Sequence, residues 1–191
     1  MRYLQVEDMR DLAYGAAILG TGGGGDPYIG MLLAEQVIRE YGPVKLVGLD
    51  EIDDDAFSAS VAYVGAPVVM IEKLMGFADM VKAFQSLERY MGRKFTAVIS
   101  AEIGGANSIV PVSVAAALNL PLIDADGMGR AYPEIPLVTW TLHGISATPM
   151  AMADEKGNSL ILETIDNHWT ERFSRSIATD MGAEASAALY P

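Results

Sequence analysis

A glycine-rich run near the N-terminus, residues 20–25 (Gly-Thr-Gly-Gly-Gly-Gly), is the part of this sequence best suited to holding a ligand. Each glycine costs about 0.5–1 kcal/mol relative to alanine in regular structure, so a cluster indicates backbone with φ > 0 or in very close contact with another group. The N–H groups of such a loop can bind an oxyanion, a phosphate or a polarised carbonyl oxygen. We therefore predict ligand contacts from the loop and from the acid that follows it: Gly22, Gly23, Gly24, Gly25 and Asp26.

A flexible turn between two helices is the alternative interpretation of this run. Asp26-Pro27 at its exit favours an ordered loop, because aspartate can cap the following helix and proline fixes φ. The glycines at 20, 22 and 25 also match the dinucleotide fingerprint G-x-G-x-x-G, which must follow a strand. Apolar residues recur at helical spacing over residues 6–19, so a helix precedes the loop and a Rossmann site is not expected.

Carboxylates follow two short apolar segments that are predicted as buried strands, 95–100 and 121–123. Glu102 follows the first, and Asp124 and Asp126 follow the second, with an Ala-rich helix between them. Such a β-α-β unit has parallel strands, and ligands bind beyond their carboxyl ends. Neighbouring carboxylates suit general acid–base catalysis or a nest for a hard cation, while helix caps and turns are the structural alternative. We predict that Glu102, Asp124 and Asp126 are catalytic.

Residues around these acids are expected to bind the ligand. Gly104 and Gly105 bend the backbone away after Glu102, and Asn107 and Arg130 can donate hydrogen bonds or hold an anionic group. A structural ion pair is the alternative for Arg130. No organic cofactor is predicted, and a divalent metal ion at Glu102 and Asp124 is kept as an alternative.

Glu102 carries the sharpest expectation. A carboxylate beside Asp124 at a sheet edge should be destabilising by roughly a kcal/mol if the pair is partly exposed, because like charges repel. Such strain is kept mostly at functional sites. Glu102→Gln is therefore expected to leave thermal stability unchanged or slightly higher while activity or ligand binding falls.

The composition limits the kinds of partner. Thirteen basic and 25 acidic side chains give a net charge of −12, which repels phosphate backbones, so no nucleic-acid partner is expected. The absence of cysteine excludes disulfides, thiolate nucleophiles and Cys-based zinc sites. His143 and His168 are not spaced as paired metal ligands, and no Gly-x-Ser-x-Gly nucleophile elbow occurs.

Hydrophobic periodicity predicts an α/β fold: a mixed, partly parallel sheet flanked by helices in a single domain. The glycine-rich loop should lie near the carboxyl ends of the strands near 95–101 and 121–124. Helices are predicted at 6–19, 28–41, 77–91, 112–120 and 167–181, the last capped by Asn167. Strands are predicted at 44–48, 60–64, 68–71, 95–100, 121–123, 137–141, 150–154 and 159–164.

The domain is expected to span residues 1–182, and the small apolar residues 183–191 are interpreted as a tail or linker. The N-terminus has no apolar signal-peptide segment, and no apolar run approaches the ~18 residues of a membrane span. We expect a cytoplasmic protein without a membrane partner that forms a homo-oligomer.

Four segments occur together in order: the glycine-rich residues 19–28, Gly65-Ala-Pro67 leading to Glu72-Lys73, residues 102–107 and residues 124–134. Together they resemble the S-methyl-thiohydantoin desulfurase-like family, from about residue 5 to about residue 182. The resemblance implies that the chain is the N-terminal α/β domain of a longer protein. The implied partner is its own β-rich C-terminal domain, which is missing here.

The resemblance also implies an activity, the conversion of S-methyl thiohydantoins to hydantoins with release of a thiol. The substrate would be a small cyclic amide, attacked by water at a polarised C=N carbon. The residues can be fitted to this chemistry: Glu102 or Asp124 as base, Asp126 as acid, and the amides of 22–25, Asn107 or Arg130 as donors to developing charge. The alternative is a non-catalytic ligand-binding or regulatory partner of hydantoinase-type enzymes.

Overall fold

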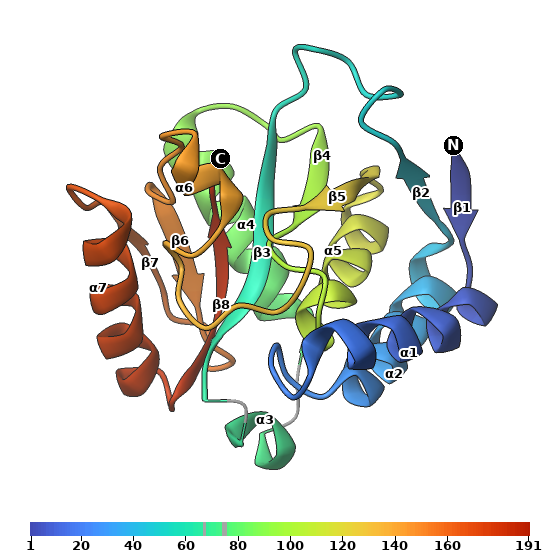
Figure 1. Ribbon diagram of the computed structural model, residues 1–191, viewed down its shortest axis with the longest axis horizontal. Helices are drawn as coiled ribbons and strands as arrows, with labels where there is room; N and C mark the ends of the chain where they lie inside the picture. The colour runs from blue at the N-terminus through green and yellow to red at the C-terminus, as the bar shows by residue number, and fades with distance from the viewer. Residues whose placement is uncertain (67, 74–75) are drawn as a thin grey trace.

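The computed structural model describes residues 1–66, 68–73 and 76–191 (Figure 1). Its helical elements are η1 (Val6–Asp8), α1 (Met9–Gly20), α2 (Pro27–Tyr41), α3 (Val69–Glu72), α4 (Ala78–Met91), η2 (Ala106–Ser108), α5 (Val110–Leu118), α6 (Thr139–Leu142) and α7 (Asn167–Asp180). Its strands are β1 (Arg2–Leu4), β2 (Val44–Val47), β3 (Ser58–Gly65), β4 (Ala97–Ser100), β5 (Leu122–Asp126), β6 (Met150–Ala153), β7 (Ser159–Leu162) and β8 (Glu184–Leu189).

The strands form one mixed sheet in the order β1-β2-β5-β4-β3-β8-β6-β7 (Figure 1). Strands β2, β5, β4 and β3 run parallel, whereas β1, β8, β6 and β7 pair antiparallel with their neighbours. Strands β4 and β5 are adjacent and parallel, with Val98 opposite Leu122, and α5 connects them. The α/β fold with a mixed, partly parallel sheet and the β-α-β unit within it are therefore confirmed.

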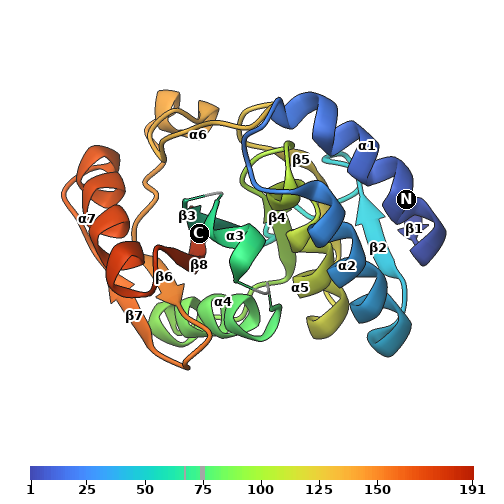
Figure 2. The ribbon, with the colours of Figure 1, turned by 90° about the horizontal axis from the view of Figure 1, so that it is seen from below.

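Both faces of the sheet are covered around its centre. Helices α4 and α5 pack on one face and α7 packs on the other (Figure 2). Because side chains alternate along a strand, Ala151 and Ala153 of β6 join the core under α4, whereas Met150 and Met152 join the core under α7. Strands buried on both faces appear as continuous apolar runs, and this is why several were recognisable in the sequence.

Helices α1 and α2 form a further layer on the α5 side and hold the glycine-rich loop between them (Figure 2). The Asp26 carboxylate accepts a hydrogen bond from the amide of Tyr28 at 2.9 Å and caps α2, with Pro27 as the first helical residue. Gly30 allows α2 to pack closely against η2, because a Cβ atom on this residue would lie 3.3 Å from Ala106. The loop is ordered, as the Asp-Pro exit predicts.

Three expectations about secondary structure are wrong. Residues 69–72 form the single-turn helix α3 rather than a strand, and residues 139–142 form the short helix α6. Short apolar runs fit either type of element, and tertiary contacts decide between them. The expected tail 183–191 contains β8, a strand in the middle of the sheet between β3 and β6.

The start of α7 also differs from the prediction. Asp166, not Asn167, caps α7, because the Asp166 carboxylate accepts the hydrogen bond from the amide of Trp169 at 2.9 Å. Asn167 is buried and its Oδ1 accepts from the amide of Ala147 at 2.7 Å.

Pro67, part of one segment that carries the family resemblance, lies outside the described residues. Within the described ranges, none of the helices combines the length and apolar character needed to cross a membrane.

Candidate functional site

A cavity of about 460 Å³ lies where the carboxyl end of β3 meets the segment after β4 and the glycine-rich loop. Its volume matches that of small-molecule binding sites. Polar and glycine residues on its walls include Gly23, Gly24, Gly25, Tyr63, Glu102, Asn107, Arg130, Tyr132, Glu134, Arg175 and Glu184. The cavity therefore brings together groups from both ends of the chain.

The glycine-rich loop is packed directly against the backbone that follows β4. The amide of Asn107 donates to the carbonyl oxygen of Gly24 at 3.0 Å, and the amide of Ala106 donates to that of Gly25 at 3.2 Å. Gly105 has φ +65°, and a Cβ atom on it would overlap the carbonyl oxygen of Gly23 and the backbone of Gly24. These glycines are required for close approach of two backbone segments, and the predicted position of the loop at the carboxyl end of this strand is confirmed.

The loop also contains amides that have no acceptor within the described part of the chain. Gly24 and Gly25 have φ of +74° and +83°, so their peptide units are turned away from helical orientation. Within residues 1–66, 68–73 and 76–191, neither amide donates a hydrogen bond. Both residues line the cavity. Two adjacent amides in this arrangement can bind a carbonyl oxygen or an anion.

Glu102 is buried on the cavity wall, with 5% of its surface exposed. Its Oε1 accepts a hydrogen bond from Asn107 Nδ2 at 2.6 Å, and its Oε2 accepts one from the amide of Tyr132 at 2.8 Å. Burial raises the pKa of Glu102; the two hydrogen bonds oppose this effect, the charge of Asp126 adds to it, and Arg175 opposes it. A fixed carboxylate with a raised pKa is suited to proton transfer near neutral pH.

The Asn107 side chain links Glu102 to strand β3 of the central sheet. Its Oδ1 accepts from the amide of Tyr63 at 2.7 Å, and its Nδ2 donates to the carbonyl oxygen of Tyr63 at 3.2 Å as well as to Glu102. Strand β4 pairs with β3 only from Ser58 to Val61, so the Asn107 side chain occupies the position of a strand neighbour beyond the end of β4. The orientation of Glu102 is thereby set by β3.

Replacing Asn107 by Ala is expected to lower the free energy of unfolding by about 3 kcal/mol, because buried groups of Tyr63 and Glu102 lose their partners. The pKa of Glu102 should rise further, since one of the bonds that stabilise its ionised form is removed. A raised folded-state pKa stabilises the protein below the unfolded value, and this contribution is lost as pH rises through the folded pKa. The stability deficit of the variant should therefore grow with pH across that window.

Urea unfolding at several pH values and carboxyl NMR of Glu102 measure these effects. Asn158→Ala is the matched control, because Asn158 Nδ2 donates to the buried Asp154 carboxylate at 2.7 Å in the turn between β6 and β7. It should lose stability without moving the pKa of Glu102. An unchanged Glu102 titration in Asn107→Ala would contradict the assignment.

The other two predicted catalytic acids lie outside the cavity lining. Asp126 Oδ2 accepts hydrogen bonds from the amides of Ile103, Met128 and Gly129 at 3.0, 3.1 and 2.7 Å, so this carboxylate organises the turns after β4 and β5. Asp124 is exposed. Strand pairing places Asp126, not Asp124, opposite the end of β4. Among the described residues, no group of three His, Cys, Asp or Glu side chains is arranged to hold a metal ion.

Two arginines line the cavity and differ in their freedom. Arg175 donates to Glu171, to the carbonyl oxygen of Pro133 at 2.7 Å and to that of Gly65 at 3.3 Å, so it fastens the cavity wall to α7. Arg130 is exposed at the cavity and its Nε donates to the carbonyl oxygen of Ala131 at 3.0 Å. Its terminal nitrogens have no acceptor within the described part of the chain. Arg130 is therefore available to a ligand.

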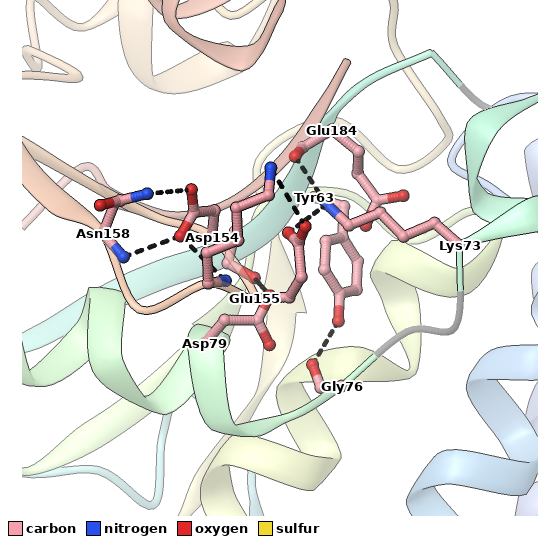
Figure 3. A network of polar contacts seen from close by, with 10 residues as sticks. Tyr63, Lys73, Gly76, Asp79, Asp154, Glu155, Asn158 and Glu184 are labelled. Atoms are coloured by element: carbon pink, nitrogen blue, oxygen red, sulfur yellow. Dashed lines mark hydrogen bonds and ion pairs between the residues drawn. The ribbon is translucent and has the colours of Figure 1, made fainter. Parts of the chain in front are cut away.

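A second acidic residue, Glu184 of β8, also lines the cavity, and its backbone carbonyl belongs to a polar network (Figure 3). Lys73 Nζ donates to the carbonyl oxygen of Glu184 at 3.1 Å and pairs with Glu155 Oε2 at 2.6 Å. The Tyr63 hydroxyl donates to the carbonyl oxygen of Gly76 at 2.5 Å. Burial is the main reason why the pKa values of Tyr63 and Glu184 are raised.

The structure thus brings some of the predicted residues together and separates others. Gly23, Gly24, Gly25, Glu102, Asn107 and Arg130 line the cavity, whereas Gly22, Asp26, Gly104, Gly105, Asp124 and Asp126 do not. Tyr63, Tyr132 and Glu184 were not among the predicted site residues. A signal for Glu184 existed: it begins the run Glu-Ala-Ser-Ala-Ala-Leu, whose small apolar residues are typical of a strand buried on both faces.

Comparison with known proteins agrees with this architecture. The chain is 30% identical to a protein from Chromobacterium violaceum whose X-ray crystal structure was determined as a Northeast Structural Genomics Consortium target, with a TM-score of 0.82. The match covers 100% of this chain and 54% of that one, so the chain spans about half of the length of that protein. None of the curated proteins compared with the chain matches it. The family model described as "S-Me-THD-like, N-terminal domain" matches residues 7–164, and the chain therefore belongs to this family.

Proposed function

We propose that this domain binds a cyclic ureide in the cavity and hydrolyses an S-methyl thiohydantoin to a hydantoin with release of a thiol. The observation that carries the proposal is the position of Glu102, a buried carboxyl group on the wall of a cavity that Gly24 and Gly25 also line, held by two donors and with a raised pKa. Membership of the S-Me-THD-like family supports the substrate class.

The chemistry of the cavity suits a five-membered ureide ring, which presents N–H donors and carbonyl acceptors along its edge. The amides of Gly24 and Gly25 can donate to a ring carbonyl oxygen and to the charge that develops on it. The Glu102 carboxylate can accept a proton from water or a hydrogen bond from a ring N–H. Arg130 is free to pair with an anionic substituent of the ring.

Water attack requires a base, and Glu102 fits that role better than the other two predicted acids. Asp126 accepts three backbone hydrogen bonds with one oxygen, and Asp124 is exposed outside the cavity. A carboxylate in a buried site retains a higher proton affinity than one in water, which assists removal of a proton from water. Because the solved relative is about twice as long as this chain, residues outside it can also take part in the reaction of the whole protein.

One observation favours the alternative function, a ligand-binding domain without chemistry. Both oxygens of Glu102 already accept hydrogen bonds, and a carboxylate held in this way also makes a rigid acceptor for a ring N–H. The cavity would then recognise a hydantoin without activating water.

Thiol release separates the two functions. The protein is mixed with S-methyl thiohydantoins, the released thiol is followed with a chromogenic disulfide, and binding of hydantoin is measured by calorimetry. We expect thiol release together with hydantoin binding. Binding without thiol release would assign the non-catalytic function, and the absence of both would contradict a cyclic-ureide site.

A further inference from the structure

Glu184 is placed on the cavity wall by long-range strand pairing. It is the first residue of β8, opposite Gly65 at the carboxyl end of β3. A Cβ atom on Gly65 would overlap the carbonyl oxygen of Ala183, so the two strands are in very close contact at this point. The backbone that carries Glu184 is therefore held firmly, and the residue, with 2% of its surface exposed, lines the cavity.

The carboxyl group of Glu184 has an oxygen without a partner. Its Oε2 is buried and makes no hydrogen bond among the described residues. The nearby ammonium group of Lys73 pairs with Glu155 and donates to the Glu184 backbone carbonyl oxygen (Figure 3). Asp79 accepts from the Ser186 hydroxyl at 2.7 Å. The polar neighbours of Glu184 are thus satisfied by other groups.

An ionised carboxylate is poorly stabilised in these surroundings, because a buried charge without donors is costly. Burial raises the pKa of Glu184, and the charges of Asp79 and Glu155 raise it further, whereas Lys73 opposes them. The Tyr63 hydroxyl also faces this cluster and stays protonated, because burial raises its pKa. Glu184 accordingly differs from Glu102, whose two oxygens both accept hydrogen bonds that stabilise the ionised form.

We propose that Glu184 is the neutral carboxyl group of the cavity and donates the proton that the bound ureide needs, complementing Glu102 on the wall after β4. This inference rests on the proposed function for its catalytic part. Two carboxyl groups whose environments differ in this way are the usual arrangement for a base and an acid in one site. The acid role is thus assigned to Glu184, which is not among the site residues predicted from the sequence.

The two carboxyl groups together supply and take up every proton that the reaction transfers. The Glu102 carboxylate takes a proton from water while the water oxygen bonds to the ring carbon. The π electron pair of the C=N bond then moves to the ring nitrogen, and this nitrogen takes the proton of Glu184. The C–S bond of the resulting adduct then breaks, and methanethiolate takes the proton held by Glu102. The adduct hydroxyl gives its proton to the Glu184 carboxylate as the C=O bond forms, which restores both groups.

Glu184→Gln tests the proposal, because it keeps the shape of the side chain and removes the transferable proton. Thiol release should fall about 100-fold or more, the usual range for loss of a general acid. Glu88→Gln is the matched control, since Glu88 is a buried residue outside the cavity and the change in charge is the same. The control should keep thiol release within a few-fold of wild type. Wild-type turnover in Glu184→Gln would overturn the proposal.

A second readout does not depend on turnover. The infrared spectrum of the wild type at neutral pH should contain a carbonyl-stretch band of a protonated carboxyl group that is missing in Glu184→Gln and present in Glu88→Gln. Hydantoin affinity should fall as pH rises through the folded pKa of Glu184, because the donor is lost and a charge appears, and this dependence should vanish in Glu184→Gln. The absence of both effects would overturn the proposal.

The two readouts separate the failure of the proposal from that of the proposed function. If the wild type releases no thiol, the hydrolase function fails, and the infrared band and the hydantoin titration still decide whether Glu184 is a neutral donor. Should Glu184→Gln not fold, Glu184→Asp retains an acid but withdraws it by one methylene group. It should then show the infrared band with reduced thiol release, and unchanged release would count against the assignment.

Discussion

Replacing Glu102 by Gln is expected to lower the rate of thiol release by about 100-fold or more, because the amide cannot accept the proton of the attacking water. The residual activity should no longer depend on pH in the range where Glu102 titrates. In the wild type the rate should rise with pH through the folded pKa of Glu102, which burial displaces upward, since the ionised form is the base. Thiol release measured as kcat/KM over a pH series tests both statements.

The structure also changes the expected effect of this substitution on stability. Both oxygens of Glu102 accept hydrogen bonds, and the donor nitrogen of a glutamine would have to face either Asn107 Nδ2 or the amide of Tyr132. One donor is then left without an acceptor, which costs about 1–3 kcal/mol. We therefore expect a modest loss of stability in place of the unchanged or higher stability that the sequence suggests.

Glu88→Gln is the control that separates stability from chemistry. Glu88 is equally buried, with 6% of its surface exposed, and accepts from the amide of Phe95 at 3.0 Å and from Lys94 at 2.8 Å, outside the cavity. It should lose a comparable amount of stability and retain thiol release. If Glu102→Gln loses activity only in proportion to its unfolding, as Glu88→Gln would, Glu102 is a structural residue and not the base.

Gly105→Ala should be among the most destabilising single substitutions in the chain, with a loss of about 4 kcal/mol or more. The backbone conformation of Gly105, with φ +65° and ψ −161°, is essentially restricted to glycine and contributes about 1–3 kcal/mol of this loss. The remainder comes from the overlap of the new Cβ atom with the backbone of Gly23 and Gly24, which are not flexible side chains and must move as a loop. Moving them also displaces residues that line the cavity.

Gly22→Ala separates these two contributions. Gly22 has φ +96°, and no atom lies within 4 Å of the position of its Cβ. Its substitution should therefore cost only the conformational part, about 1–2 kcal/mol, and leave hydantoin binding unchanged. Urea unfolding of both variants, with calorimetry of hydantoin, measures the difference. Equal losses in the two variants would show that the close approach of the two segments contributes nothing to stability.

Local sequence patterns were sufficient to predict the helices and strands that carry the site. The β-branched run before Glu102, the Ala-rich helix and the strand before Asp124 predicted the parallel β-α-β unit that the structure contains. Asp26-Pro27 predicted the capped start of α2. Each of these signals acts over a few residues, through capping hydrogen bonds, hydrophobic periodicity or steric limits on φ, and such signals can be recognised without a tertiary structure.

Which acids face the cavity was decided by tertiary structure. Sequence spacing treated Glu102, Asp124 and Asp126 alike, yet only Glu102 lines the cavity, because the register of β4 and β5 and the turn amides direct Asp126 elsewhere. A shift of one residue along a strand moves a side chain to the other face, and no local pattern reports that register.

The position of β8 was likewise a matter of long-range pairing. Its residues Glu-Ala-Ser-Ala-Ala-Leu are mostly small, both faces of the strand are buried, and the segment was interpreted as a tail. In the folded chain Ser60 pairs with Leu189 and Gly65 with Glu184, contacts that join residues more than a hundred positions apart. The sequence by itself determined the glycine-rich loop, the parallel unit and Glu102 as a candidate. Only the tertiary structure, through pairing of distant strands, placed Glu184 on the same cavity.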